Sequence, residues 1–278
     1  FSPDVSNVRK AVEANNPHGF YDKTKADNPF KDWYHVVIPY CTGDIHWGDN
    51  VATYGQGDKA FKINHKGSVN VRAVLDWVYA GFSAPEQVLV TGCSAGSYGS
   101  VMWSGHIAEH YPNSRVIQFG DSGAGIITKD FFTESFPNWK AEQSFPTWIP
   151  SLDPKTVNVL DLELGDLYAG LTKHYTKHQF SQYNTAFDNN QVFYFQAMGG
   201  GDKFEWSKQM HASISKIEAA APAFASFIPS GEQHCILADD NFYTVHVDNH
   251  RLVDWLADMV AGKTVTDLAC TKCDDKTP

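Results

Sequence analysis

The sequence predicts an α/β fold built around a mostly parallel sheet. Short apolar, β-branched runs bounded by turn residues alternate with longer stretches of helical periodicity, which is the pattern of crossover helices on such a sheet. The chain has 278 residues, 42% of them hydrophobic, enough for the core of one large domain. No internal repeat or break in composition divides it. We therefore expect one domain over residues 1–278, in which residues 266–278 form a polar C-terminal tail.

The predicted strands are short runs rich in β-branched and aromatic residues. They are His35–Pro39, Gln87–Thr91, Arg115–Phe119, Gln179–Asn184 and Ala223–Ile228.

Helical periodicity is clearest in Gly67–Ala80 and Asn249–Ala261, each of which places four apolar residues on one face. We expect these faces to pack on the sheet. Two short helices are predicted within Asp153–His174 and one over Phe204–Ala220, whereas Gln191–Met198 fits either a strand or a helix.

Charge and hydropathy exclude two classes of protein. The formal net charge is −10 and no run of Lys or Arg occurs, so no nucleic-acid-binding surface is expected. No stretch approaches the roughly 18 to 20 apolar residues of a membrane-spanning helix. The chain opens on Phe1 rather than Met, so we expect it to be processed or partial.

The motif Gly92-Cys-Ser-Ala-Gly96 lies between the predicted strand Gln87–Thr91 and a helical stretch, Ser97–His110. Strand, sharp turn and helix form the context of the nucleophile elbow of α/β-hydrolases, with Ser94 as the nucleophile. The elbow strains the backbone of Ser94, and we expect larger residues at Gly92 and Gly96 to collide with neighbouring elements. The backbone N–H of Ala95 would stabilise an oxyanion. The alternative is a glycine-rich turn in which Ser94 only caps the helix.

The catalytic base expected on this fold is a histidine in the loop after the last strand. His234 fits best, because it follows Ala223–Ile228 and precedes the C-terminal helix. His246 and His250 lie further along, where surface or helix-capping roles are favoured.

The acid should follow the preceding strand, and Asp188 does so. It would fix the tautomer of the histidine and stabilise the imidazolium. Asp202 and Asp121 are the alternatives. Asp121 follows the strand after the nucleophile helix, so shaping the substrate pocket is its better role.

Further pocket candidates surround the end of the early strand, because substrate loops gather at the carboxyl ends of parallel strands. They are Trp33, Tyr40, Thr42, Asp44 and Trp47. Packing inside the protein is an equally good role for each.

Two other motifs are weaker. His106-Ile-Ala-Glu-His110 matches an inverted zinc-protease pattern, but no third ligand is apparent and a solvated helix face is favoured. The five cysteines leave one unpaired in an exported protein. Cys270 and Cys273 have C-x-x-C spacing without a second pair, so a disulfide in the tail is favoured over zinc, and structural burial is favoured for Cys93 and Cys235.

Five separated segments together resemble the pectin acetylesterase/Notum family of carboxylesterases. They are Ile38–Asp44, Gly92–Gly96, Asp121–Gly123, Phe187–Gln191 and His234–Cys235. The resemblance implies an extracellular, metal-independent esterase that needs no cofactor, with Ser94 as nucleophile, Asp188 as acid and His234 as base. It favours Asp188 over Asp202 through the Asp-x-x-Gln match.

The sequence departs from the family pattern at two places. Ser97 stands where the family has glycine, a small change at the second helical position. The family also places an early strand ending in a Gly-Gly-Gly-type segment, which completes the oxyanion hole, before the region where this chain begins. We therefore hypothesise that a cleaved N-terminal fragment stays associated and supplies that strand, held through a disulfide to the leftover cysteine.

The resemblance favours acetyl esters of polysaccharide as substrates. Removal of a lipid acyl group from protein and hydrolysis of a polyester such as polyhydroxybutyrate remain alternatives, and pocket volume should discriminate between them. A catalytically silent binding protein would be expected to lack a triad residue, and none is missing.

Overall fold

The central sheet of this computed structural model, which describes residues 18–274 and 276, has five parallel strands in the order β3-β4-β5-β6-β9. The strands are β3 (Gln87–Cys93), β4 (Arg115–Asp121), β5 (Gln179–Tyr183), β6 (Phe224–Ile228) and β9 (Leu268–Ala269). The predicted parallel sheet is therefore confirmed. Part of the expected polar tail joins it, because β9 pairs with β6.

One predicted strand is wrong. His35–Pro39 forms no strand, although its sequence has strand propensity. Val36 and Val37 are 43% and 52% exposed. A strand needs a neighbour to pair its backbone groups, and no ladder partner is present for this segment in the described part of the chain.

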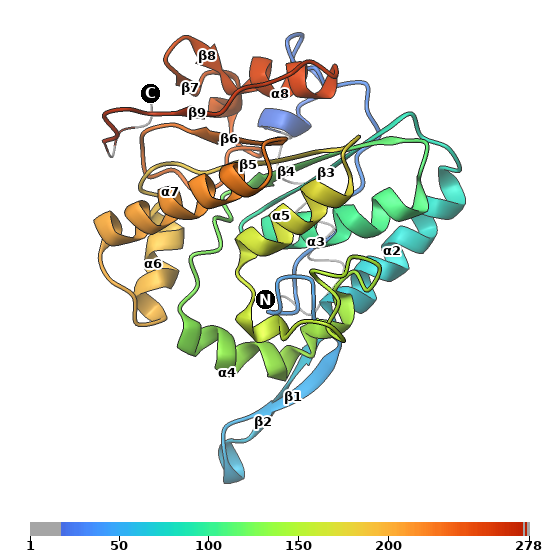
Figure 1. Cartoon of the computed structure of the whole chain (residues 1–278), viewed down its shortest axis with the longest axis vertical. Helices are drawn as coiled ribbons and strands as arrows, with labels where there is room; N and C mark the ends of the chain where they lie inside the picture. The colour runs from blue at the N-terminus through green and yellow to red at the C-terminus, as the bar shows by residue number, and fades with distance from the viewer. Residues whose placement is uncertain (1–17, 275, 277–278) are drawn as a thin grey trace.

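Helices cover both faces of the sheet (Figure 1). One core packs beneath α2 (Gly67–Gly81), α3 (Ala95–His110), α5 (Leu164–His174) and α7 (Lys203–Ala220). The opposite face is covered by α8 (Leu252–Val260) together with aromatic residues of the early chain, among them Phe20 and Phe30. The amphipathic helices predicted from Gly67 and from Asn249 thus pack on opposite sides of the sheet.

The ambiguous stretch Gln191–Met198 is helical, within α6 (Asn189–Ala197). Two elements are not predicted from the sequence: α4 (Lys129–Trp139) and the antiparallel hairpin of β1 (Asn50–Tyr54) and β2 (Phe61–His65), which extends away from the body (Figure 1). A second small hairpin precedes α8 and comprises β7 (His246–Val247) and β8 (His250–Arg251). Short 3-10 helices span Gly19–Tyr21, Gly57–Lys59, Ala141–Ser144, Val159–Asp161 and Asp240–Tyr243.

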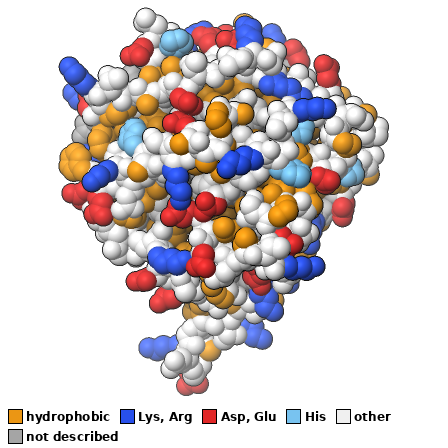
Figure 2. Space-filling view, viewed as in Figure 1, with side chains coloured by type: hydrophobic (Ala, Val, Ile, Leu, Met, Phe, Trp, Pro, Cys, Tyr) orange, Lys and Arg blue, Asp and Glu red, His pale blue; other side chains and the backbone are white. Residues whose placement is uncertain are grey.

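In the described part of the chain, no helix has the length and apolar character needed to cross a membrane. Acidic and basic side chains are interspersed on the face shown in Figure 2, with no continuous basic area there.

The parallel sheet brings the carboxyl ends of its strands to one edge, where the following loops meet. Ser94 follows β3, Asp188 lies after β5, and His234 lies after β6. Three segments far apart in the sequence are therefore placed at one edge of the sheet.

Candidate active site

Ser94 lies at the turn between β3 and α3 with φ 56° and ψ −117°, a left-handed conformation that is costly for a residue with a side chain. The turn is held on both sides. The Ser94 N–H donates to the Asp121 carbonyl at 2.8 Å, and the Ser94 carbonyl accepts from the Ser97 N–H at 2.9 Å. The helix thus begins directly after Ser94, with the Ala95 N–H among its first donors.

The two glycines of the motif have different environments. A Cβ at Gly92 would lie 2.4 Å from the carbonyl oxygen of Gly96, so this position must be glycine for the turn to close. A Cβ at Gly96 would meet no atom within 4 Å. The expected collision at Gly96 is therefore wrong, because this residue faces the cavity described below.

Ser97 is fully buried and fits because two glycines lie opposite it. A Cβ at Gly123 would approach the Ser97 Cβ to 2.4 Å, and one at Gly120 would approach the Ser97 Oγ to 2.5 Å. The departure from the family pattern at position 97 is thus accommodated by local packing.

Asp188 and His234 form a close pair. Nδ1 of His234 lies 2.9 Å from both carboxylate oxygens of Asp188, whose side chain is fully buried. The same carboxylate accepts from the N–H groups of Asn190 and Gln191 and so caps α6, and it also accepts from the Gln191 side chain at 3.0 Å. An ionised carboxylate only accepts hydrogen bonds, so Nδ1 carries the proton and Nε2 is the free acceptor.

The loop that carries His234 is bonded to the loop that carries Asp188. The N–H groups of Ala186, Phe187 and Asn189 donate to the carbonyls of Pro229, Gly231 and Glu232 at 2.9 to 3.0 Å. These contacts fix the carboxylate and the imidazole relative to each other.

A disulfide joins the residues that neighbour Ser94 and His234. Cys93, which precedes Ser94, is bonded to Cys235, which follows His234, and a ring nitrogen of His234 lies within 4.8 Å of both sulfurs. The structure thus brings the loop of the Asp188–His234 pair to the turn at Ser94. Cys93, His234 and Cys235 are grouped as a metal site would require, but the bonded sulfurs are not thiolates and cannot serve as ligands.

The alternative acid Asp202 and the alternative bases His246 and His250 contact other parts of the chain. Asp202 caps α7 by accepting from the N–H groups of Phe204 and Glu205 at 3.0 Å. His246 contacts the Thr244 carbonyl, and His250 is exposed in β8.

Asp121 lies beneath the site rather than in it. It is fully buried, and its carboxylate accepts from the N–H groups of Ile236 and Leu237 at 2.9 and 3.0 Å. Burial raises the pKa of this carboxyl to about 6. The expectation that Asp121 contacts substrate is therefore not supported by its position. Its contacts fix the loop that follows His234.

The same correction applies to Thr42, Asp44 and Trp47, which are 7%, 0% and 4% exposed. The Asp44 carboxylate accepts from the Thr42 hydroxyl and the Gly67 N–H, and the Trp47 indole donates to the Tyr98 carbonyl at 2.9 Å. These three residues organise the loop from within. Tyr40 and Trp33 line a cavity, as expected.

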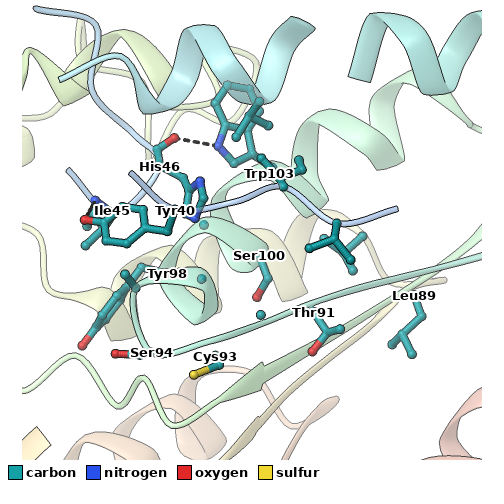
Figure 3. Close-up of a pocket in the computed structure, with 18 of the residues that line it drawn as sticks. Tyr40, Ile45, His46, Leu89, Thr91, Cys93, Ser94, Tyr98, Ser100 and Trp103 are labelled. Atoms are coloured by element: carbon teal, nitrogen blue, oxygen red, sulfur yellow. Dashed lines mark hydrogen bonds between the residues drawn. The ribbon is translucent and has the colours of Figure 1, made fainter. Parts of the chain in front are cut away.

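That cavity has a volume of about 1520 Å³ and two parts. One end is lined by Ser94 and Ala95. Tyr98 lies beside Ser94, and Tyr40 lies further along the same end (Figure 3). Burial raises the pKa of Tyr98 to about 12, so its hydroxyl stays protonated there. Lining residues that the sequence did not indicate include Ile126, Ile127, Gln191, Tyr194 and Met198.

The second part is a groove along β3, lined on one side by Val88–Thr91 and on the other by Tyr34–Ile38. Leu89 and Thr91 lie on the β3 side in Figure 3. We call this part the β3 groove.

The two histidines of the H-x-x-E-H motif contact residues of the protein interior or of neighbouring helices rather than each other. His106 donates from Nε2 to the Ser144 carbonyl at 2.8 Å, while the ring of His110 stacks on Tyr79 at 3.5 Å. The two imidazoles of the H-x-x-E-H motif thus have separate partners.

The disulfide in the tail is confirmed as Cys270–Cys273. The expectation that Cys93 and Cys235 are simply buried is wrong, because they form a disulfide and Cys93 is exposed. The unpaired cysteine is Cys41, which is exposed.

A parallel sheet, a strained serine at a strand-to-helix turn and a histidine on a buried carboxylate define an α/β-hydrolase. Comparison with solved structures agrees on the fold. The Wnt deacylase Notum from Drosophila matches with a TM-score of 0.69 at 15% identity, covering 99% of this chain and 87% of that one. A second crystal form of the same protein matches with a TM-score of 0.62.

The chain belongs to the pectinacetylesterase family, whose model matches residues 6–207. Pectin acetylesterase 5 of Arabidopsis thaliana is 28% identical over 111 residues, which is 39% of this chain and 25% of that relative. Pectin acetylesterase 11 of the same plant is 27% identical over 121 residues, 42% of this chain and 30% of the relative. The match thus spans only about a quarter of the length of the first relative. The resemblance identified from the sequence is confirmed.

Proposed function

We propose that this protein is a secreted serine carboxylesterase that removes acetyl groups from polysaccharide. The observation that carries the proposal is the Asp188–His234 pair bridged to the strained turn at Ser94. Family membership supports an esterase, and two disulfides support an exported protein.

In the proposed cycle, Ser94 Oγ attacks the ester carbonyl while Nε2 of His234 accepts its proton. The imidazolium, stabilised by Asp188, returns the proton to the departing alcohol. Water then attacks the acyl-enzyme with the same histidine as base, and acetate is released. The Ala95 N–H stabilises the oxyanion in both steps of the cycle, acylation of Ser94 and hydrolysis of the acyl-enzyme.

The size of the cavity favours a second candidate, hydrolysis of long acyl esters, because about 1520 Å³ exceeds what an acetyl group requires. However, this volume includes the β3 groove as well as the end at Ser94. If another segment fills the groove, only a small acyl pocket remains beside the nucleophile.

The unpaired edge of β3 supports such a segment. Within the described chain β3 forms a ladder only with β4, so its N–H and C=O groups on the groove side have no strand partner. We propose that a cleaved N-terminal fragment of the same protein, distinct from residues 1–278, pairs there as an extended segment and brings the second oxyanion donor. The exposed Cys41, next to Tyr40 at the cavity, is available to bond it.

The function is tested with p-nitrophenyl esters from acetate to palmitate, together with acetylated pectin, acetylated xylan and polyhydroxybutyrate. We expect acetate esters and an acetylated polysaccharide to be hydrolysed best. A preference for palmitate would establish the long-acyl alternative, and a preference for polyhydroxybutyrate would establish the polyester alternative. Failure to hydrolyse any of these esters would favour a binding protein.

The groove proposal is tested by intact-mass analysis of active protein, with and without reductant. We expect a second polypeptide whose loss lowers turnover about 10²- to 10³-fold, the effect of losing one oxyanion donor. Full activity of a single polypeptide corresponding to residues 1–278 would contradict it.

A further inference from the structure

The Cys93–Cys235 disulfide spans 142 residues of sequence and joins the immediate neighbours of Ser94 and His234. We propose that this disulfide is a positioning element for catalysis, which holds the imidazole of His234 where it can accept the proton of Ser94. The inference rests on the proposed esterase function and assigns these two cysteines a role in it.

The hydrogen bonds of the His234 loop do not tie it to the turn at Ser94, so the disulfide is what holds the two together. The loop from Pro229 bonds to the segment that carries Asp188, and Ile236 and Leu237 bond to the Asp121 carboxylate. Among the described residues, no hydrogen bond joins this loop directly to the turn at Ser94–Gly96. The direct covalent link is Cys93–Cys235, with a Cα–Cα distance of 5.5 Å.

The backbone is strained close to both ends of the disulfide, and the bond keeps the strained residues from relaxing. Ser94 has φ 56° and Cys235 has φ 61°, both left-handed conformations that residues with side chains rarely adopt. The disulfide ends at Cys235 itself and at the residue before Ser94. If it were broken, each strained residue could relax, and relaxation at Cys235 would turn the adjacent His234 away from the nucleophile.

The fold around the site has other supports. The backbone carbonyl of Asp121 accepts a hydrogen bond from the Ser94 N–H, and its carboxylate accepts from the loop after His234. The Cys235 N–H also donates to the Ser122 hydroxyl. We therefore expect loss of the disulfide to shift His234 without unfolding the protein. Cys93 is exposed, so a reductant can reach the bond in the folded state.

The test compares two double variants on p-nitrophenyl acetate. Cys93→Ala/Cys235→Ala is expected to lower kcat about 10²-fold, the effect of a catalytic group misplaced by about 1 Å, with KM changed less than about twofold. Cys270→Ala/Cys273→Ala, which removes the other disulfide, is the matched control and should keep the wild-type kcat. Near-UV circular dichroism establishes that each variant is folded.

Reversible reduction gives a second measurement that does not depend on the folding of Cys93→Ala/Cys235→Ala. The Cys41→Ala/Cys270→Ala/Cys273→Ala protein, whose only cysteines are Cys93 and Cys235, is treated with dithiothreitol, which breaks the Cys93–Cys235 bond, yields two thiols and is itself oxidised to a cyclic disulfide. We expect kcat to fall while the circular dichroism spectrum is kept, and to return on reoxidation.

Two results would overturn the inference: unchanged kcat after loss of the disulfide, or unfolding on reduction, which would make the bond a stabiliser of the fold. Ser94→Ala is run beside these proteins to separate the two proposals. Wild-type activity of Ser94→Ala would remove the esterase proposal itself, whereas an inactive Ser94→Ala beside a fully active Cys93→Ala/Cys235→Ala would remove only the positioning role.

Discussion

Replacing Ser94 by alanine is expected to lower kcat for p-nitrophenyl acetate about 10⁶-fold, the loss seen when a serine hydrolase loses its nucleophile. The covalent route disappears, and only oxyanion stabilisation and binding remain. Alanine removes one hydroxyl of a half-buried residue at a turn held by backbone bonds to Asp121 and Ser97, so the fold should persist. Steady-state kinetics and a thermal unfolding curve measure the two effects.

Ser100→Ala is the matched control for this change. Ser100 lies on the same helix and also lines the cavity, but its hydroxyl donates to the Ser97 carbonyl and accepts from the Gln118 side chain. Its loss should leave kcat within about tenfold, because a neutral hydrogen bond contributes about 1 kcal/mol and Gln118 keeps its contact with the Tyr168 hydroxyl. Ester hydrolysis by Ser94→Ala at the rate of Ser100→Ala would contradict the assignment of the nucleophile.

Replacing Asp188 by asparagine is expected to lower kcat about 10⁴-fold, as it does in proteases with this triad. The asparagine oxygen can still cap α6 by accepting from Asn190 and Gln191. Its NH₂ group would then face Nδ1 of His234 and force the proton onto Nε2. That nitrogen could no longer accept the serine proton, so the site would be intact in shape and inactive.

Asp202→Asn separates this effect from helix capping. Asp202 caps α7 with the same geometry, two backbone N–H groups accepted by one carboxylate oxygen, but it has no contact with His234. Asp202→Asn changes an exposed cap and should lose little stability in thermal melts, whereas Asp188→Asn also loses the bond from the Gln191 side chain to a buried carboxylate and should lose more stability while remaining folded. Only Asp188→Asn should lose activity, and equal kcat values for the two variants would refute the assignment of the acid.

The parts of the site that the sequence predicted correctly depend on local patterns. The turn at Ser94 follows from a strand, two glycines and a helix within 25 residues, and chain order then directed attention to Asp188 and His234. The pairing Cys93–Cys235 could not be predicted, because five cysteines allow many connectivities and only the fold brings these two together.

The errors arose where tertiary context decides the outcome. His35–Pro39 has strand propensity but lacks a neighbour to pair with, and Gly96 faces a cavity rather than a packed element. Asp44 and Asp121 are predicted near substrate because each follows a predicted strand, where substrate loops gather. Both instead accept backbone N–H groups inside the protein, and sequence offers no sign of that difference.

The packing of Ser97 against Gly123 links two positions through a single shared volume. A side chain can occupy that space from α3, or from the segment after β4, but not from both. Relatives with glycine at the position of Ser97 therefore gain room opposite it at the position of Gly123, whereas Gly120 is also confined by the Tyr168 hydroxyl, 2.6 Å from where its Cβ would lie. Size at positions 97 and 123 should vary together during evolution of the family, even though each residue taken alone would look like an unremarkable small amino acid.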